Sequence, residues 1–331
     1  MRGIYYENTH TNIPGWDPSM HESVPYGYAY ETDSHFVHFY GNSCDFNLIA
    51  VGLTAIQGKN GTLLDWVQSV FGATNIQPLR NEIGHVIEGI WRPSLRFRGD
   101  IQTALKVDSF DRQSSGQALR NLITKLDELF LYIEPSSHGL QAYGHKCREL
   151  LILACTEVEN HWVSLIKRSN LQNSSGRYVT RDYVRLLNPC LLKEYKISYK
   201  NHFGLRDFNP FTGWDSANPT ISLTWYDAYN KTKHDRNTSF NYATLENVLD
   251  AIAACIVMYC VKYGPYDLTS DNTLLSGAIN EHFTISFEGS DRSSYYIPQL
   301  THPVNTRKDL LIYDSYREKH NDIWVTDPLV L

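Results

Sequence analysis

Apolar residues recur at three- and four-residue steps through the middle of the chain, as they do along one face of an amphipathic helix. Leu119, Leu122, Leu126 and Phe130 follow this step. The same pattern predicts four long helices, over residues 114–133, 140–169, 221–235 and 242–263. Because the last two are joined by a short connection, they should run antiparallel, as neighbours in an up-and-down bundle do.

The regions on either side of these helices show short apolar runs and alternation of apolar and polar positions, which are typical of strands. Pro93 would place one of these strands at a sheet edge or a bulge. The predicted elements are strands in Tyr28–Tyr40, Phe46–Ile56, Ile87–Phe97, His282–Phe287 and Leu310–Tyr313, and a short helix near Leu63–Phe71.

These patterns together predict a mainly α protein with a four-helix bundle over about residues 115–263. A mixed α/β, aromatic-rich N-terminal region precedes the bundle, and a short C-terminal extension with strand follows it. The corresponding domain boundaries are 1–110, 111–265 and 266–331. Within the bundle region, Asp207–Pro219 is rich in Asn, Pro, Gly and Asp and is predicted to be an ordered loop held by Phe211 and Trp214.

Composition narrows the classes of function. The 331 residues carry a formal net charge of −6, which argues against a protein that coats nucleic acid without sequence preference but leaves room for a local cationic site. Six cysteines form no CxxC pair and are predicted to be reduced thiols, as in a cytoplasmic protein. The longest apolar run, Ala251–Val261, has 11 residues, fewer than the roughly 20 that a membrane span needs. No membrane association is predicted.

Candidate chemistry gathers on the predicted helix over residues 221–235. Tyr226, Asn230, Lys233 and His234 are three and four residues apart and share one face of that helix. Histidine can accept a proton near neutral pH, cations can hold a phosphate, and an amide can orient a hydroxyl or a phosphate oxygen. This combination suits cleavage of a phosphodiester.

The stretch with Trp225, Tyr229–Asn230, Lys233–His234 and Arg236 resembles the active-site segment of HEPN-type RNases and bacterial proteins with the motif W-x-x-x-Y-N-x-x-K-H-x-R. HEPN proteins are helical bundles whose signature is an arginine, a polar residue, three variable residues and a histidine. Here Asn230 and His234 occupy the last two signature positions, and Tyr229 stands where the signature has arginine. The resemblance covers about residues 115–263, under half of the chain.

The resemblance implies a HEPN-like bundle and a metal-independent endoribonuclease, or RNA-binding protein, of a bacterial defence or toxin system. It implies no cofactor, an RNA substrate, a homodimer, and an antitoxin or other defence protein as partner. His234 is the expected general base, Arg236 and Lys233 hold the phosphate, and Asn230 orients it. The expected RNA contacts come from Lys231, Tyr226 and Tyr229.

Three alternatives stay open. Lys231, Lys233, His234 and Arg236 lie near a helix C-terminus, where positive charge favours the helix dipole without any ligand. The protein could also be a non-catalytic scaffold that docks partners on its aromatic N-terminal region. A metal site at Glu157, Glu159 and His161 is disfavoured, because the Glu-x-Glu-x-His spacing differs from the Glu-x-x-His of di-iron bundles and has no second copy.

Overall fold

The fold is described from a computed structural model of the chain. It describes residues 2–13, 25–41, 51–171, 177–200, 202, 204–270, 272–302, 308–312 and 324–331. The chain divides into two compact units, each built from separate stretches of sequence. The sheet unit comprises Met1–Val86, Arg92–Asp100 and Ser290–Asp327, and the helical unit comprises Ile87–Trp91, Ile101–Gly289 and Pro328–Leu331.

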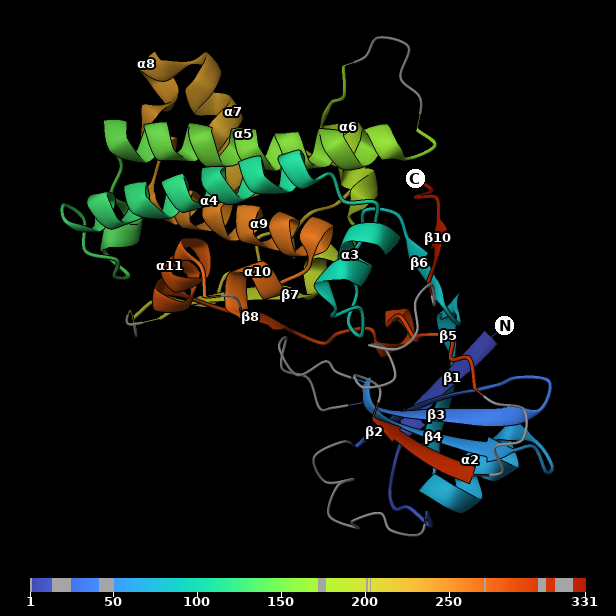
Figure 1. The fold of residues 1–331 in the computed structure, drawn as a ribbon. Helices are drawn as coiled ribbons and strands as arrows, with labels where there is room; N and C mark the ends of the chain where they lie inside the picture. Colours follow the sequence, from blue (N-terminus) through green and yellow to red (C-terminus); the bar gives the residue numbers. More distant parts are fainter. Residues whose placement is uncertain are drawn as a thin grey trace. The chain divides into compact units, whose positions relative to one another are not determined.

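The sheet unit is built on one antiparallel sheet with the strand order β5-β1-β2-β3-β4-β9 (Figure 1). Five of its strands come from the N-terminal region, and the sixth is added at the edge by residues more than 200 positions later. The strands are β1 (Arg2–Glu7), β2 (Tyr26–Glu31), β3 (His35–Gly41), β4 (Val51–Gly58), β5 (Thr74–Glu82) and β9 (Lys308–Ile312). A separate two-stranded ladder joins β6 (His85–Ile87) to β10 (Val325–Asp327).

Helix α2 (Leu63–Phe71) covers one face of this sheet. The Thr62 side chain accepts a hydrogen bond from the Asp65 amide and starts the helix, and Gly72, in the left-handed conformation at φ 57°, ends it. Trp66 and Phe71 bury their rings against Phe36 and other apolar side chains of the strands. The predicted helix near Leu63–Phe71 is confirmed with these bounds.

Tyrosines fill much of the sheet unit's interior. Tyr28 stacks on Tyr295 with ring centroids 5.9 Å apart, and the Leu300 amide donates to the Tyr30 hydroxyl at 2.8 Å. Tyr6, Tyr28, Tyr30 and Tyr40 are all at most 1% exposed. The rings of these four residues are core, so they cannot form the docking surface proposed for the aromatic N-terminal region.

The helical unit contains four long helices, several short ones and a two-stranded ladder. The long helices are α4 (Ser109–Phe130), α5 (His145–Arg168), α7 (Thr224–His234) and α9 (Leu245–Tyr263). The short helices are α6 (Thr180–Tyr183), α8 (Arg236–Ser239), α10 (Tyr266–Thr269) and α11 (Leu274–His282), with the 3₁₀ turns η1 (Gly139–Gln141), η2 (Val184–Leu186), η3 (Leu192–Glu194) and η4 (Phe240–Tyr242). The ladder pairs β7 (Tyr195–Tyr199) with β8 (Phe283–Phe287). Helix α3 (Arg98–Ala104) spans the boundary of the two units in sequence, and η5 (Arg292–Ser294) belongs to the sheet unit.

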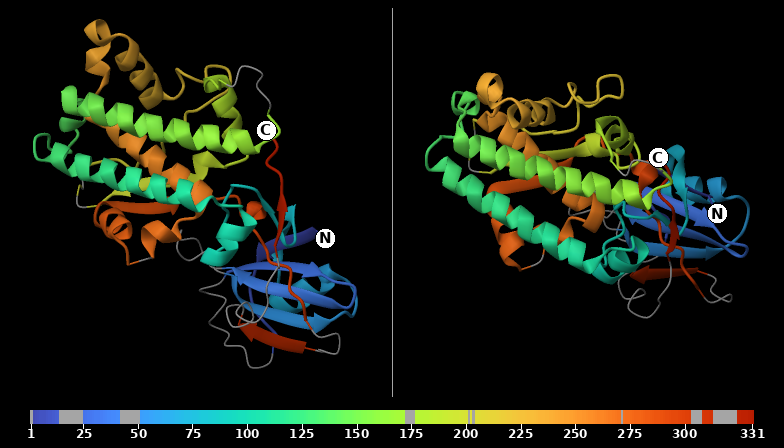
Figure 2. Two further views of the ribbon diagram at one scale, coloured as in Figure 1. Left: turned by 45° about the horizontal axis from the view of Figure 1, so that its top comes forward. Right: turned by 90° about the horizontal axis from the view of Figure 1, so that it is seen from above.

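Helix α9 is the centre of the helical unit. All of its residues are buried except Glu246 and Asn247, so other elements cover it around its whole circumference, and its buried residues include the charged Asp250 and Lys262. Helices α4, α5 and α7 pack against it, and the Tyr199 hydroxyl of β7 donates to the Leu249 carbonyl at 3.0 Å. Figure 2 shows α4 and α5 side by side, running in opposite directions.

The fold-class prediction is wrong. The protein is not a mainly α four-helix bundle, because five N-terminal strands form an antiparallel sheet with β9, and the β7–β8 ladder lies within the helical unit. Strand β5 has the sequence TNIQPLRNE, in which Pro78 and polar residues hide the alternation. Strands β7 and β8 are about ninety residues apart in sequence, so their pairing leaves no local signal.

Several predicted elements are confirmed with shifted bounds. Strands β2, β3 and β4 lie within or overlap the segments Tyr28–Tyr40 and Phe46–Ile56, of which residues 46–50 lie outside the described part. The helix predicted from residue 114 begins at Ser109, since the Asp108 carboxylate accepts hydrogen bonds from the Phe110 and Asp111 amides.

One local prediction is wrong. Residues 88–97 form turns instead of the strand predicted for Ile87–Phe97, and Gly89 and Ser94 have positive φ angles of 73° and 77°. The short connection predicted between the last two helices contains the short helix α8 and the 3₁₀ turn η4. In the described part of the chain, no helix has both the length and the apolar character needed to cross a membrane.

An ion pair between a buried lysine and a partly exposed aspartate joins α4 to α9. Lys262 Nζ lies 2.8 Å from Asp111 Oδ2, and the side chains are 2% and 37% exposed. The Tyr263 hydroxyl donates to the same carboxylate oxygen at 2.9 Å. Burial would raise the pKa of Asp111, but the hydrogen bond and charge of Lys262 outweigh it and lower that pKa.

Replacing Asp111 with asparagine should lower the free energy of unfolding by about 2 kcal/mol, because the buried Lys262 ammonium loses its counter-charge. Glu149→Gln is the matched control. It removes an equally short pair with Lys125, at 2.8 Å, whose side chains are 39% and 50% exposed, and should cost less than about 1 kcal/mol. Urea denaturation of both variants measures the difference, and equal losses would contradict this role for the pair.

The same pair should make stability depend on pH. Because the pKa of folded Asp111 is lowered, its contribution is complete above the ordinary aspartate pKa of about 3.9 and is lost as the pH falls through the lowered value. The stability difference between wild type and Asp111→Asn should therefore shrink as the pH is lowered from 5 towards 3. A constant difference in urea titrations across about pH 5 to 3 would show that the carboxylate charge is not responsible.

Candidate functional site

Helix α7 carries the predicted site and is held by one buried face. Trp225, Tyr226, Ala228, Tyr229 and Thr232 form this face, and α7 packs on α5 and α9. The Trp225 indole donates to the Pro210 carbonyl at 2.9 Å. That carbonyl belongs to the predicted ordered loop, in which Phe211 and Trp214 are fully buried.

Two predicted RNA-contacting residues lie inside the protein. Tyr226 and Tyr229 are 4% and 1% exposed. Both hydroxyls donate to the Glu159 carboxylate on α5, Tyr229 at 3.4 Å. Burial, with a further contribution from Glu159, raises the pKa of Tyr226 well above its usual range. Neither ring can stack on a base, so their role is to attach α7 to α5.

The two predicted lysines lie at the surface, and each already has a partner. Lys233 Nζ donates to the Tyr229 hydroxyl at 2.8 Å, and that hydrogen bond raises the pKa of Lys233. Lys231 Nζ lies 2.6 Å from Asp227 Oδ2, one helical turn earlier. Both ammonium groups are therefore positioned by this helix, and both keep donors that an incoming phosphate could use.

His234 and Asn230 share the solvent side of α7. His234 is the last residue of the helix and is exposed, and Asn230 is half-buried one turn earlier. Positions four apart on a helix lie on the same side. Among the described residues, neither the imidazole nor the amide makes a hydrogen bond. They are the predicted site residues that remain available to a ligand.

The chain reverses sharply after His234. The Asp235 carboxylate accepts hydrogen bonds from the Asn237 and Thr238 amides, both at 3.1 Å, and starts α8. Arg236 is the first residue of α8, and its side chain lies outside the described part of the structure.

Arg148 is a neighbour of the site that the sequence did not indicate. Its Nε donates from α5 to the Thr232 carbonyl at 3.0 Å, at the end of α7. Cations are favourable at a helix C-terminus, where carbonyls lack intrahelical donors. Arg148 lies 84 positions before Thr232, so no local sequence pattern could have associated the two.

The cluster Glu157, Glu159 and His161 is divided between two sides of α5. Glu159 faces the tyrosines of α7, whereas His161 lies near Lys262 and Tyr263 of α9. Burial, and then the charge of Lys262, lowers the pKa of His161 to about 3. In the part of the chain that is described, no three His, Cys, Asp or Glu residues are grouped so that they could hold a metal ion.

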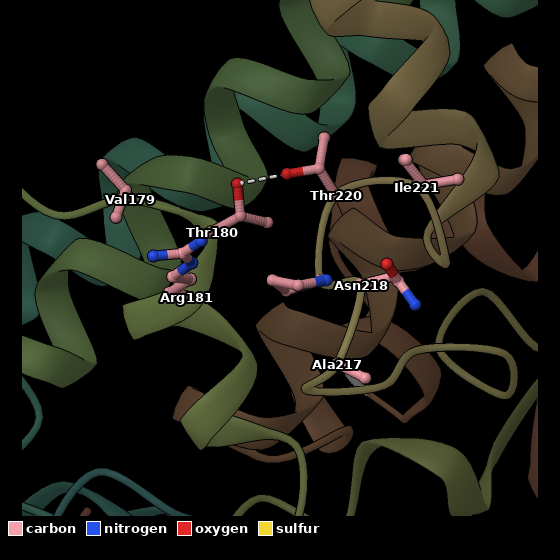
Figure 3. Close-up of a pocket in the computed structure, with 8 residues that line it drawn as sticks. Val179, Thr180, Arg181, Ala217, Asn218, Thr220 and Ile221 are labelled. Carbon is pink, nitrogen blue, oxygen red and sulfur yellow. Dashed lines mark hydrogen bonds between the residues drawn. The ribbon is translucent and has the colours of Figure 1, made fainter.

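A surface hollow of about 410 Å³ lies at the other end of α7 (Figure 3). It is formed by α6 and the loop before α7, and the Thr220 hydroxyl donates to Thr180 Oγ1 at 2.9 Å across it. The lining residues are Val179, Thr180, Arg181, Ala217, Asn218, Pro219, Thr220 and Ile221. None of the predicted site residues is among them, so this hollow is separate from the His234 end.

Comparison with protein-family models, curated proteins and solved structures finds no match to this chain. The likeness to HEPN proteins therefore rests on the motif around His234 alone. What this site can do has to be inferred from its own residues.

Tyr226→Phe should lower the free energy of unfolding, whereas His234→Ala should leave it almost unchanged. The first removes a hydroxyl that donates to the half-buried Glu159 carboxylate and should cost about 1–3 kcal/mol of unfolding free energy. His234→Ala truncates an exposed side chain that has no hydrogen bond to a described residue, and should change the free energy of unfolding by less than about 0.5 kcal/mol. Thermal and urea denaturation measure both. A large loss in His234→Ala would mean that the imidazole is structural.

Proposed function

We propose that the protein binds RNA at the C-terminal end of α7 and cleaves it without a metal ion, with His234 as general base. One observation carries this proposal: His234 and Asn230 lie one turn apart on the solvent side, with side chains that make no hydrogen bond to described residues. A surface imidazole kept for stability alone would need no free amide beside it.

In the proposed reaction, the His234 imidazole accepts the proton of a ribose 2′-hydroxyl. The 2′-oxygen attacks the adjacent phosphorus, and the bond from phosphorus to the 5′-oxygen breaks. The products are a 2′,3′-cyclic phosphate and a 5′-hydroxyl, whose proton comes from water. Atoms and charge balance without an oxidant or a metal.

The remaining polar groups act on the phosphate. Lys233 can donate from the ammonium hydrogens that do not bind Tyr229, and the Asn230 amide can orient a phosphate oxygen. Lys231 contributes less positive charge to the site than Lys233, because the Asp227 carboxylate lies 2.6 Å from its ammonium group and partly offsets its charge. Arg236, two residues after His234, completes the proposed set of cations.

The biological setting is part of the same proposal. The motif implies a bacterial defence or toxin protein that acts as a homodimer in the cytoplasm, with an antitoxin or defence protein as partner. The five described cysteines are free and buried, as suits a reducing compartment. A net charge of −6 fits a protein that engages a few nucleotides at one place.

Position 229 favours a second candidate, an RNA- or partner-binding protein that does not cleave. The HEPN signature has arginine there, whereas Tyr229 is buried and its hydroxyl bonds to Glu159 and Lys233. In this alternative, His234 and Asn230 contact a ligand only.

Incubation of mixed RNA with the protein in EDTA separates the two candidates. The wild type should release fragments ending in 2′,3′-cyclic phosphate, and His234→Ala should lower the rate at least about 100-fold, as expected for loss of a general base. Asn230→Ala should lower it less. His138→Ala is the matched control, because it removes another exposed imidazole of the same unit, one that belongs neither to the proposed site nor to its surroundings. Cleavage unchanged in His234→Ala, or no cleavage by the wild type, would overturn the catalytic proposal.

A further inference from the structure

Aromatic rings gather at the surface beside the end of α7. The Phe240 ring lies 5.9 Å from that of Tyr143 and 4.8 Å from that of His145, measured between centroids. Tyr143 and Tyr242 are 54% and 43% exposed, so part of each side chain is open to a ligand. We call Tyr143, His145, Phe240 and Tyr242 the aromatic patch.

Backbone hydrogen bonds hold the patch in place. Tyr143 forms a β-bridge with Thr244, and the Leu245 amide donates to the Ala142 carbonyl at 2.8 Å. The Thr244 side chain then starts α9 by accepting from the Asn247 amide. The rings therefore stand at the starts of two long helices, α5 and α9, and rigid rings bind at a small cost in conformational entropy.

The patch is continuous with the proposed catalytic end. Lys231 Nζ of α7 lies 4.6 Å from the centroid of the Tyr242 ring, and α7 packs against η4, which contains Phe240 and Tyr242. Phe240 comes only six positions after His234 in the sequence. Aromatic faces, a lysine and exposed histidines thus occur together on one surface.

We infer that the aromatic patch stacks the bases of single-stranded RNA and delivers the strand to His234. This inference rests on the proposed function and adds the form of the substrate. Proteins that bind single strands combine aromatic rings, on which any base can stack, with cations that follow the phosphates. Continuity with the proposed catalytic end favours RNA over an apolar protein segment. Lys231, whose charge Asp227 partly offsets, lies 4.6 Å from the centroid of the Tyr242 ring, and Lys233 lies on the same helix.

The test measures binding and cleavage separately. Binding of a fluorescent single-stranded RNA is measured by anisotropy in a His234→Ala background, so that the RNA stays intact. Tyr242→Leu should weaken binding by roughly tenfold, and Tyr242→Phe should restore it, since the ring stacks without its hydroxyl.

Phe110→Leu is the matched control. Phe110 is 81% exposed but lies at the start of α4. The end of α4, not its start, lies beside the patch end of α5, because Lys146 binds Glu128 at 2.8 Å. Phe110→Leu should bind RNA like the wild type. Duplex RNA of the same sequence should be insensitive to Tyr242→Leu, because its bases are already stacked.

Cleavage assays of these variants distinguish two failures, that of the RNA-stacking inference and that of the catalytic proposal. With His234 present, Tyr242→Leu should raise KM and leave kcat unchanged. Binding that depends on Tyr242 in a protein that never cleaves would support the inference and overturn catalysis. Equal binding by Tyr242→Leu, Phe110→Leu and wild type would overturn the inference, and so would a patch that binds a protein partner but no RNA.

Discussion

The Glu159 carboxylate determines how the site is presented. It accepts hydrogen bonds from the hydroxyls of Tyr226 and Tyr229, so one face of α7 is attached to α5 and cannot turn outward. With that face inside, helical geometry leaves Asn230 and His234 towards solvent. The exposure of the imidazole is thus a consequence of the hydrogen bonds that hold Tyr226 and Tyr229 against α5.

The attachment also changes the electrostatics of the predicted site. Tyr229, at the signature arginine position, is neutral and buried, and Lys233 reaches back to it from one turn later. Positive charge therefore comes from Lys233 and from Arg148 at the end of α7, whereas Asp227 partly offsets the charge of Lys231. Aromatic rings beside a few cations suit a short single strand better than a long duplex.

The long helices could be predicted because each repeats one apolar step along its own length. The start of α2 and the end of α9 were also predictable, since Thr62 and Gly264 are local signals. Strand β5 was missed because Pro78 and polar residues obscure it. Strand β8 was predicted, as His282–Phe287, but its partner β7, about ninety residues earlier in the sequence, was missed. The sheet that overturns the predicted bundle depends on such distant pairings.

Some features of the candidate site could likewise be predicted from the sequence, and others could not. From the sequence alone came the residue types on α7, their spacing and thus the pairing of Asn230 with His234 on one side. Only the tertiary structure decided that Tyr226 and Tyr229 point inward, that Arg148 approaches from α5 and that Phe240 lies against His145. Helical spacing is local and is written in consecutive residues, whereas the side of a helix that is buried depends on partners brought together only by folding.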